Sequence, residues 1–368
     1  MDLPSIVSVN EAFYPHEGGS EKRSYEILTR LSRKGFNIKV LTNPFPGKTE
    51  IKGIDIEYVT SMDERKYFNS SSRRIRGVLE FGKACRDAVK RNREYDIFNF
   101  DEFPLYHGIK AVSSIPDGKR SFFMWHEVLK ELYNERGGLW RIASMWEKKI
   151  TKVFTDHVAV SNTVAQMLNE KYGLNRVSVV ENGVDTKAFG SNLGKKTWGK
   201  IIYVGRIEPH KQLDLLINAF KNMSEFQLNI IGGGSQLDYL KTRVNGTSNI
   251  KFLGHVDNEE LLREVRDSWL FVMPSNREGF SIASLEAMAS SIPVVTVGGH
   301  YNLAANEIIK NGYNGLVSPN FDQMMAEIRN LYINEDSWKL LSNNAREFSR
   351  DFDWDAIADR MARIYTQN

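Results

Sequence analysis

Short apolar runs alternate with longer segments of helical period in the first half of the chain. A run of about five apolar residues bounded by polar residues or glycine is typical of a buried strand. Between the first two runs, apolar residues recur three or four positions apart from Tyr25 to Leu31, and Gly35 marks the end of this predicted helix. The strands predicted in this half are 5–9, 36–41, 96–100, 121–125 and 157–160.

The same alternation restarts after a segment rich in Gly, Asn, Lys and Ser, 182–200, which predicts a linker. Alternating strands and helices favour a parallel, doubly wound sheet, so the chain is predicted to have two α/β halves of similar size. We expect the carboxyl ends of both sets of strands to face each other across a ligand-binding cleft. The second half has predicted strands at 200–204, 226–231, 250–253, 270–273 and 293–297, and predicted helices at 213–220, 259–265 and 284–289.

Length and composition are those of an ordinary globular protein with two domains. The 368 residues are 41% hydrophobic and 26% charged, which excludes collagen-like, disordered and disulfide-scaffold chains. The single cysteine, Cys85, allows neither an internal disulfide nor a cysteine-based zinc site. No run approaches the ~20 apolar residues of a membrane span, and the first residues lack the basic charge of a signal peptide. We therefore expect a soluble, cytoplasmic protein.

The net charge of +3 is too small to indicate nucleic-acid binding, but its distribution is uneven. Residues 1–185 carry 29 basic and 25 acidic side chains, against 20 and 21 in the remainder. The excess is concentrated at 73–93, where eight basic residues face only Glu80 and Asp87. A patch of this kind attracts phosphate groups on a substrate or a lipid.

The basic segment 73–93 also has the pattern of an amphipathic helix. One interpretation is an interfacial helix that touches anionic lipid, which would place the protein peripherally on the cytoplasmic membrane face. The other, which we favour, is a helix packed on its sheet with a solvated basic face. The apolar positions of the predicted face are Ile75, Val78, Leu79, Gly82, Cys85 and Val89.

Three loops that follow predicted strands have the composition of phosphate sites. In 15–21, Gly18 and Gly19 would let the backbone approach an anion at a helix start; the alternative is a tight turn with Ser20 as N-cap. In 203–211, Arg206 and Lys211 place two cations in one loop; the alternative is a solvated basic loop.

The third loop is the glycine run 232–234. It resembles a dinucleotide fingerprint, but the last glycine of that motif would fall at Leu237. A broken fingerprint disfavours a Rossmann dehydrogenase. We therefore interpret these glycines as permitting close backbone approach rather than direct ligand contact.

The segment 275–286 combines two carboxylates with a helix start. Glu278 lies in the loop and Glu286 in the following helix, with seven residues between them. One carboxylate can accept hydrogen bonds from sugar hydroxyls and the other from a ribose diol, while the amides of 279–281 face a phosphate. The alternative is a helix N-terminus with acids near its positive end.

Together these motifs resemble the retaining glycosyltransferases of family 4, and the resemblance runs through nearly the whole chain. It implies the GT-B fold, with two Rossmann-like doubly wound domains facing across a cleft. The implied acceptor-side domain is 1–183, onto which a C-terminal helix at 352–368 packs back, and the implied donor-binding domain is 184–351. The matching residues are 18–21, 181–185, Gly205 and Arg206 with Lys211, 232–234, 252–254, Glu278 with Glu286, and Glu307 with Gly312 and Gly315.

The resemblance also implies a role for each matching position. Arg206 and Lys211 would hold the donor diphosphate, which Gly19 would approach from the first domain, and His126 would touch the sugar near its anomeric carbon. The family often has a histidine near 99–103, which this chain lacks, so no acceptor role is assigned there. The implied catalytic residues are Arg206, Lys211, Glu278 and His126, and the implied donor-binding residues are Gly18, Gly19, Gly205, His255, Val256, Gly279, Phe280, Ser281 and Glu286.

The activity implied is transfer of a hexose, with retention, from a UDP- or GDP-sugar to a hydroxyl of a glycan, a lipid-linked glycan or a small molecule. No cofactor or metal is expected. The D-x-D motifs at 351–353 and 353–355 lie at a predicted helix start, where N-capping explains them better, and the histidines show no ligand spacing. The alternatives are a sugar-nucleotide epimerase of the same fold and a non-catalytic nucleotide-sugar binding protein.

Overall fold

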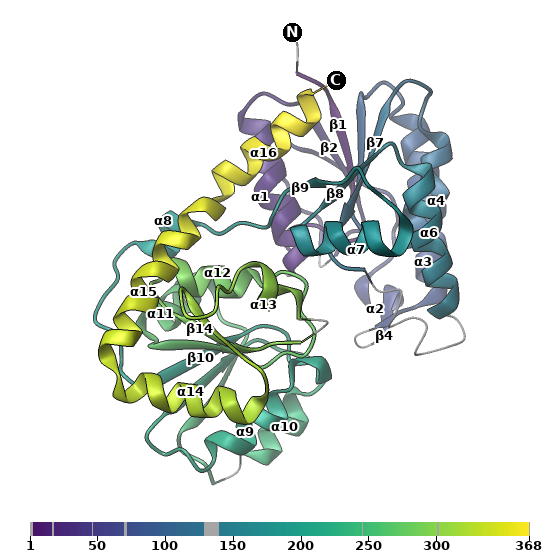
Figure 1. The fold of residues 1–368 in the computed structure, drawn as a ribbon. Coiled ribbons are helices and arrows are strands. Elements are labelled where there is room, and N and C mark those ends of the chain that lie inside the picture. The colour runs from purple at the N-terminus through teal and green to yellow at the C-terminus, as the bar shows by residue number, and fades with distance from the viewer. Residues whose placement is uncertain are drawn as a thin grey trace. The chain divides into compact units, whose positions relative to one another are not determined.

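A computed structural model describes residues 3–16, 18–45, 47–69, 72–128, 140–244, 246–299 and 302–367. The chain divides into two compact units, and the second is inserted near the C-terminal end of the first (Figure 1). Unit 1 comprises 1–181 and 355–368, and unit 2 comprises 182–354. The domain boundaries expected from the sequence, after 183 and after 351, lie close to these divisions.

Unit 1 is built on a seven-stranded parallel sheet in the order β3-β2-β1-β6-β7-β8-β9. Its central strands β1 and β6 are buried at every position, as expected for a sheet with helices on both faces. The order reverses direction between β1 and β6, which is where ligands of such sheets bind. The strands are β1 Ile6–Val9, β2 Ile38–Thr42, β3 Asp55–Tyr58, β6 Ile97–Phe100, β7 Arg120–Trp125, β8 Asp156–Ala159 and β9 Ser178–Val179.

Helices cover both faces of this sheet. In Figure 1, α3, α4 and α6 lie along one side of the unit, and α1 and α16 lie together on the other. A two-stranded antiparallel hairpin, β4 Phe68–Asn69 and β5 Ser72–Arg73, precedes α3. The helices are α1 Gly19–Arg33, α2 Glu64–Tyr67, α3 Ile75–Arg91, α4 Leu105–Ala111, the 3₁₀ turn η1 Val112–Ser114, α6 Trp140–Val153, α7 Asn162–Tyr172 and α16 Trp354–Thr366.

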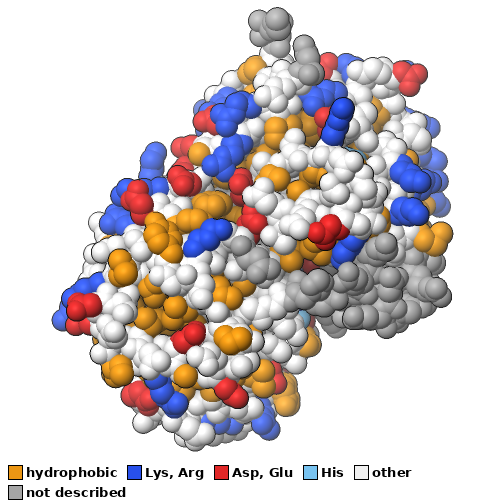
Figure 2. Space-filling view, viewed as in Figure 1, with side chains coloured by type: hydrophobic (Ala, Val, Ile, Leu, Met, Phe, Trp, Pro, Cys, Tyr) orange, Lys and Arg blue, Asp and Glu red, His pale blue; other side chains and the backbone are white. Residues whose placement is uncertain are grey.

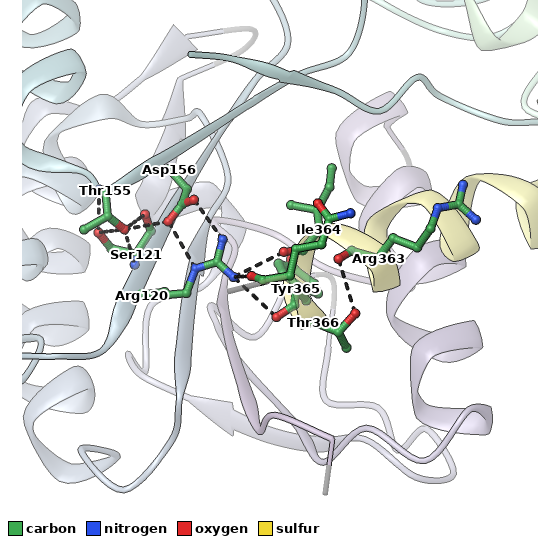
Figure 3. A network of polar contacts seen from close by, with 9 residues as sticks. Arg120, Ser121, Thr155, Asp156, Arg363, Ile364, Tyr365 and Thr366 are labelled. Atoms are coloured by element: carbon green, nitrogen blue, oxygen red, sulfur yellow. Dashed lines mark hydrogen bonds and ion pairs between the residues drawn. The ribbon is translucent and has the colours of Figure 1, made fainter. Parts of the chain in front are cut away.

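The C-terminal helix α16 docks on unit 1 through its polar carboxyl end. The Arg120 guanidinium donates to the carbonyls of Ile364, Tyr365 and Gln367 at 3.2, 3.4 and 2.6 Å and also pairs with Asp156 (Figure 3). A cation there satisfies helix-end carbonyls and complements the negative end of the helix dipole. The Tyr365 ring packs edge-on against Phe122. Residues 355–368 therefore belong to the first unit although they follow the second in sequence.

The basic segment 73–93 forms α3, which is packed on unit 1. Its buried residues are Gly77, Phe81, Gly82, Cys85, Ala88 and Val89. The predicted apolar face is correct for the last three turns but wrong at the start, because Ile75 and Leu79 are 63% and 39% exposed. Arg73 does not belong to the solvated face either: it binds the buried Glu11 carboxylate through both Nε and Nη2, each at 2.6 Å.

Unit 2 is built on a six-stranded parallel sheet in the order β12-β11-β10-β13-β14-β15. Its order reverses between β10 and β13. The core on one face joins apolar side chains of α9, α10 and α14 to strand residues such as Leu228 and Val272. The strands are β10 Lys200–Val204, β11 Gln227–Ile231, β12 Ile250–Gly254, β13 Leu270–Met273, β14 Val294–Val297 and β15 Gly315–Ser318.

The helices of unit 2 follow the strands in regular alternation. They are α8 Thr186–Gly190, the 3₁₀ turn η2 Pro209–Lys211, α9 Leu213–Phe220, α10 Leu237–Arg243, α11 Asn258–Asp267, α12 Ile282–Ala289, α13 Leu303–Glu307, α14 Phe321–Ile333, α15 Glu335–Ser349 and the 3₁₀ turn η3 Arg350–Phe352. The prediction of a linker at 182–200 is wrong in part, because this segment contains α8. Asp185 caps α8 at the amide of Ala188, and the Phe189 side chain is buried, so the segment belongs to unit 2.

The two passages of the chain at the unit boundary run side by side within unit 2. Val184 donates its amide to the Phe352 carbonyl at 2.8 Å, and Trp354 donates to the Val184 carbonyl at 3.2 Å. A Cβ at Gly183 would lie 2.6 Å from the Trp354 ring and 2.9 Å from the Phe352 carbonyl oxygen. Glycine is therefore required at 183 because the indole occupies the space of a side chain.

On the face drawn in Figure 2, basic and acidic side chains alternate in small groups, in keeping with the net charge of +3. Among the described residues, no helix is long and apolar enough to cross a membrane.

Candidate active site

The candidate donor site lies at the carboxyl ends of β10 and β13, where the strand order of unit 2 reverses. Ligands of parallel sheets bind in the crevice that such a reversal opens. The loop after β10 carries Arg206 and Lys211, and the loop after β13 carries Glu278. The Asn276 amide donates to the His210 carbonyl at 3.1 Å and holds the two loops together. The fold thus brings together residues that lie about 70 positions apart in sequence.

Lys211 and Glu278 are in direct contact across this reversal point. The Lys211 ammonium donates a hydrogen bond to Glu278 Oε2, and the two side chains are 12% and 18% exposed. The main chain of Glu278 is fixed as well, since its carbonyl accepts from the amides of Leu303 and Ala304 at 2.8 and 3.2 Å. The pair combines a cation with a carboxylate in a largely desolvated place, where electrostatic interactions are strong.

Arg206 lies in the same loop as Lys211, and its side chain is exposed. Within the described part of the chain, no hydrogen bond or ion pair engages its guanidinium. Its main chain, by contrast, is anchored, because the buried Tyr203 hydroxyl donates to the Arg206 carbonyl at 2.9 Å. Burial, and then the negative charge of Glu278, raise the pKa of Tyr203. A fixed main chain with an open guanidinium suits a residue that binds an anionic ligand.

The glycine run 232–234 permits close backbone approach, as the sequence predicted. A Cβ at Gly232 would lie 2.1 Å from the Gly205 carbonyl oxygen, and one at Gly234 would lie 2.4 Å from the Ile207 carbonyl oxygen. Both glycines have positive φ, +124° and +156°. These glycines therefore support the loop that carries Arg206, and their backbone forms part of its wall.

Residues 279–281 lead into the N-terminus of α12. Ser281 caps the helix, accepting from the Ser284 amide at 3.2 Å, and Phe280 is buried. Of the predicted donor-binding groups, the amides of Gly279, Phe280 and Ser281 are therefore at a helix start, where N–H groups and the helix dipole favour an anion. Glu286, assigned to a ribose, lies in the second turn of α12 and is only 5% exposed.

Asn302 is a structural residue of this site that the sequence analysis missed. It is fully buried, and its Nδ2 donates to the carbonyls of Ser275 and Val297 and to Thr296 Oγ1, at 3.2, 2.7 and 3.1 Å. Its Oδ1 caps α13 at the Ala305 amide, and its backbone pairs with Glu278. One side chain therefore fixes the Glu278 loop to β14. An asparagine before a short helix carries no sequence signal for this role.

The residues expected near the nucleotide base follow β12. His255 is exposed, and Val256 is partly buried. A Cβ at Gly233 would lie 2.4 Å from His255 Nε2, so the imidazole lies against the glycine run. Both residues thus lie at the same edge of the sheet as Arg206.

In unit 1, the loop with Gly18 and Gly19 leads into α1. The helix begins at Gly19 with Gly18 as its N-cap residue, so the alternative in which Ser20 is the N-cap is wrong. The Ser20 hydroxyl instead donates to Glu21 Oε2 at 2.9 Å. A Cβ at Gly18 would lie 2.1 Å from that same oxygen. A phosphate could therefore approach Gly18 only if the Glu21 carboxylate moved.

A histidine holds the Glu21 carboxylate in this position. His16 Nδ1 lies 3.4 Å from Glu21 Oε1, and His16 Nε2 lies 3.6 Å from Glu64 Oε1. The hydrogen bond to Glu21 raises the pKa of His16. Burial raises the pKa of Glu21, but the interactions with His16 outweigh it and leave that pKa below its usual value. The amino end of α1 thus carries its own internal anion.

His126 lies after β7, beside the loop that follows β6. Its Nε2 lies 2.6 Å from Asp101 Oδ1, and its backbone amide donates to Glu102 Oε2 at 2.6 Å. The segment 99–103, to which the sequence analysis gave no acceptor role, therefore supplies both partners of the predicted histidine. The available signal was two consecutive acids directly after a predicted strand.

A cavity of about 260 Å³ in unit 2 lies away from the candidate site. It is found at the amino ends of β10, β11 and β12, the opposite end of the sheet from the glycine run. Its walls include Trp198, Lys200, Gln227, Asn249 and Lys251.

The D-x-D motifs near the C-terminus make structural contacts. Asp353 Oδ2 accepts from the Thr186 amide at 3.3 Å and from its hydroxyl, and Asp355 pairs with Arg30 at 2.7 Å. Asp353 thus contacts α8 within unit 2, and Asp355 contacts α1 within unit 1; the N-capping expected from the sequence does not include these contacts. Among the described residues, no three His, Cys, Asp or Glu side chains gather as a metal-binding group.

Comparison with known proteins identifies the family. Residues 17–188 match the family described as Glycosyltransferase Family 4, and residues 185–348 match the one described as Glycosyl transferases group 1. An uncharacterized glycosyltransferase of Methanocaldococcus jannaschii is 33% identical over 371 residues, covering 99% of this chain and 97% of that protein. A glycogen synthase of Mycobacterium tuberculosis is 30% identical over 209 residues, covering 52% of this chain and 49% of that protein.

Solved structures share the architecture at low sequence identity. Sucrose-phosphate synthase from Thermosynechococcus elongatus has a TM-score of 0.81 at 18% identity, covering 98% of each chain. Anabaena HepE, solved in complex with UDP and glucose, has a TM-score of 0.75 at 18% identity, covering 99% of this chain and 100% of that one. With both halves matched and one relative aligned over nearly its full length, the chain belongs to the group 1 glycosyltransferases and has the GT-B fold.

Proposed function

We propose that this glycosyltransferase moves a hexose, with retention of anomeric configuration, from a UDP- or GDP-sugar to a hydroxyl acceptor in glycan biosynthesis. The observation that carries the donor assignment is the contact between Lys211 and Glu278 at the strand reversal of unit 2, with the exposed Arg206 in the same loop as Lys211. Two cations next to a helix N-terminus suit a diphosphate, and a carboxylate suits sugar hydroxyls. The UDP bound to Anabaena HepE supports a nucleotide donor.

The chemistry follows from where charge develops. As the bond between the sugar C1 and the phosphate oxygen breaks, negative charge grows on the departing nucleoside diphosphate. Arg206 and Lys211 are fixed to the loop after β10 and can stabilise that charge without reorganisation. By analogy with one oxyanion-hole donor, each cation contributes about 2.7–4 kcal/mol to transition-state stabilisation. Glu278 accepts hydrogen bonds from the transferred sugar and keeps Lys211 oriented.

Transfer is proposed to need no divalent metal, because two cations and helix amides can neutralise the leaving diphosphate. EDTA treatment is the direct test. Activity should persist after chelation and gain nothing from added Mg²⁺ or Mn²⁺. Loss of activity that either ion restores would overturn this part of the proposal.

Retention is proposed through a front-face path in which the departing phosphate accepts the proton of the acceptor hydroxyl. The donor configuration is then kept in the product. NMR spectra of the isolated product report its anomeric configuration, and an inverted linkage would refute the path.

The acceptor is proposed to be a hydroxyl of a glycan, a lipid-linked glycan or a small molecule, and the site of action the cytoplasm or its membrane face. A peripheral membrane contact would be made at the start of α3. Two apolar side chains, Ile75 and Leu79, are exposed there next to the exposed Arg74 and Arg76. The packed remainder of α3 equally suits a helix with a solvated basic face.

A panel of UDP, GDP and ADP, each alone and as its common sugars, tests the donor by thermal shift. A ligand present at 100 times its Kd adds about 2.7 kcal/mol of stability, enough to raise Tm by several degrees. We expect a shift with one nucleotide only, and its loss in Arg206→Ala. Arg243→Ala, an exposed arginine of α10, is the matched control. A donor converted without any acceptor would favour an epimerase, and binding without turnover a non-catalytic protein.

A further inference from the structure

His126 is clamped by two consecutive acids from the neighbouring strand end. Its Nε2 lies 2.6 Å from Asp101 Oδ1, with side chains 17% and 10% exposed. Glu102, fully buried, accepts from the backbone amides of His126 and Glu127 at 2.6 and 3.1 Å. Asp101 therefore fixes the ring and Glu102 fixes the backbone of the same residue.

The hydrogen-bond partner of His126 Nε2 determines whether His126 Nδ1 can accept a hydrogen bond. A carboxylate only accepts hydrogen bonds, so the Nε2 of His126 must carry the proton in this contact. In the neutral imidazole the other nitrogen, Nδ1, then has a free lone pair. Within the described part of the chain, no hydrogen bond engages Nδ1, and the side chain retains some exposure.

Asp101 is kept ionised by its surroundings. Burial raises its pKa, but the interactions with His126 and with the Glu102 backbone outweigh burial, and the pKa stays below its ordinary value. The carboxylate therefore persists as an acceptor at neutral pH. The other charged or titratable groups that act on the Asp101 carboxylate or on Glu102 beside it are Arg23, Glu21, His107, Glu127 and Glu147.

We infer that Asp101 is a positioning residue that holds His126 in the Nε2–H tautomer, so that Nδ1 accepts a hydrogen bond from a sugar hydroxyl during transfer. The inference rests on the proposed function, because the hydroxyl belongs to the sugar being transferred or to its acceptor. No bond is made or broken by Asp101 itself. Its effect reaches the substrate only through the imidazole.

The tautomer can be measured without any activity assay. Long-range ¹H–¹⁵N spectra of the full-length protein distinguish the two ring nitrogens, and subtraction of a His126→Ala spectrum identifies this residue among the seven histidines. In the wild type we expect the proton on Nε2. In Asp101→Asn the amide group can donate to Nε2, so the Nδ1–H form should gain population, with no such change in the matched control Asp117→Asn, an exposed acid of the same unit.

Turnover gives the second readout. Asp101→Asn should lower kcat about 10- to 100-fold, by analogy with loss of the carboxylate partner of a metal-binding histidine. Donor KM should change less than kcat, and Asp101→Asn should cost nothing further in a His126→Ala background. A tautomer that is unchanged in Asp101→Asn, or an equal loss of kcat in both backgrounds, overturns the inference. If the wild type turned over no nucleotide sugar, the proposed function would fail, while the spectra would still decide whether Asp101 sets the tautomer.

Discussion

In unit 2, the loops at the strand reversal present two cations, one carboxylate and bare glycine backbone. In unit 1, the corresponding edge presents carboxylates, each already matched to a base: Asp101 to His126, Glu21 to His16, and Glu11 to Arg73. Both edges arise from the same parallel-sheet topology. The open cation Arg206 has no counterpart among those unit 1 pairs.

The difference is in the chemistry of the loops, not in the topology of the sheets. Cations and helix-end amides bind phosphates, whereas fixed carboxylates and an imidazole lone pair accept hydrogen bonds from hydroxyl groups. Sheet topology supplies the location in both cases, and the loop residues supply the chemistry. Under the proposed function, the cations of unit 2 bind the phosphates of the donor, and His126 of unit 1 contributes to recognition of a sugar hydroxyl.

The largest effect on turnover is expected from loss of a cation that is proposed to stabilise the leaving diphosphate in unit 2. Lys211→Ala removes one fixed cation and leaves the Glu278 carboxylate without that partner, so kcat should fall about 100- to 1,000-fold, or about 2.7–4 kcal/mol. Steady-state kinetics with the donor found by thermal shift measure it. Lys221→Ala, an exposed lysine after α9, should retain full activity. Near-normal kcat in Lys211→Ala would break the assignment of phosphate to unit 2.

The second prediction concerns acid sensitivity, which should be concentrated in unit 1. Burial lowers the pKa of His157 to about 4, and Trp125 Nε1 donates to its Nδ1 at 3.1 Å. Because the folded state disfavours the charged ring, the unfolded chain takes up the proton first as pH falls below about 6.5. Unfolding free energy should therefore drop as pH falls from about 6.5 to about 4, by about 3 kcal/mol in total.

Denaturant unfolding at several pH values measures this slope, and hydrogen exchange of unit 1 peptides locates it. His157→Gln keeps an oxygen that can accept from Trp125 but does not titrate, so its slope should be flatter. Equal slopes in the two proteins would contradict the prediction. Burial also lowers the pKa of His107, so some slope should remain in the variant.

The third prediction tests how the Glu278 loop is held. Asn302→Ala leaves buried carbonyl groups without their donor and should lower unfolding free energy by about 1–3 kcal/mol. Transfer activity should fall with it, because Glu278 loses the support of β14. Asn334→Ala removes an exposed N-cap of α15 and should cost about 1 kcal/mol with activity unchanged. Equal effects of the two substitutions on activity would show that Asn302 is only a helix cap.

The smallest effect on stability is expected from substitutions of exposed arginines at the start of α3. Arg74→Glu with Arg76→Glu changes two exposed side chains, so stability should change by less than about 0.5 kcal/mol. Arg73 must stay in this test, because its reversal would set two carboxylates against each other at Glu11. Sedimentation with anionic vesicles decides between the two interpretations of α3: reduced binding favours membrane contact, and unchanged binding favours a solvated face.

Sequence patterns were sufficient for the buried strands but found only one of the strands at the edges of the two large sheets, β12, which was predicted at 250–253. The fully buried β1, β6 and β13 are mostly apolar, with Ser8 and Asn99 as the polar exceptions, and were predicted to within one residue. The edge strand β3 was missed, because Asp55–Tyr58 is partly exposed and has no apolar run. Edge strand β15 contains a glycine and a serine and was missed for the same reason. Burial on two faces produces a sequence signal that one-sided packing does not.

The two α/β halves, the family, and the loops that carry Arg206, Lys211 and Glu278 follow from the amino-acid sequence, because local period and motif spacing are properties of the chain. The folded structure was needed to show that Lys211 meets Glu278, that Asn302 holds their loop, and that Glu21 fills the space at Gly18. It was also needed to pair Asp101 with His126. Such contacts join residues from different strand ends, and their geometry depends on strand order and packing, which no local pattern encodes.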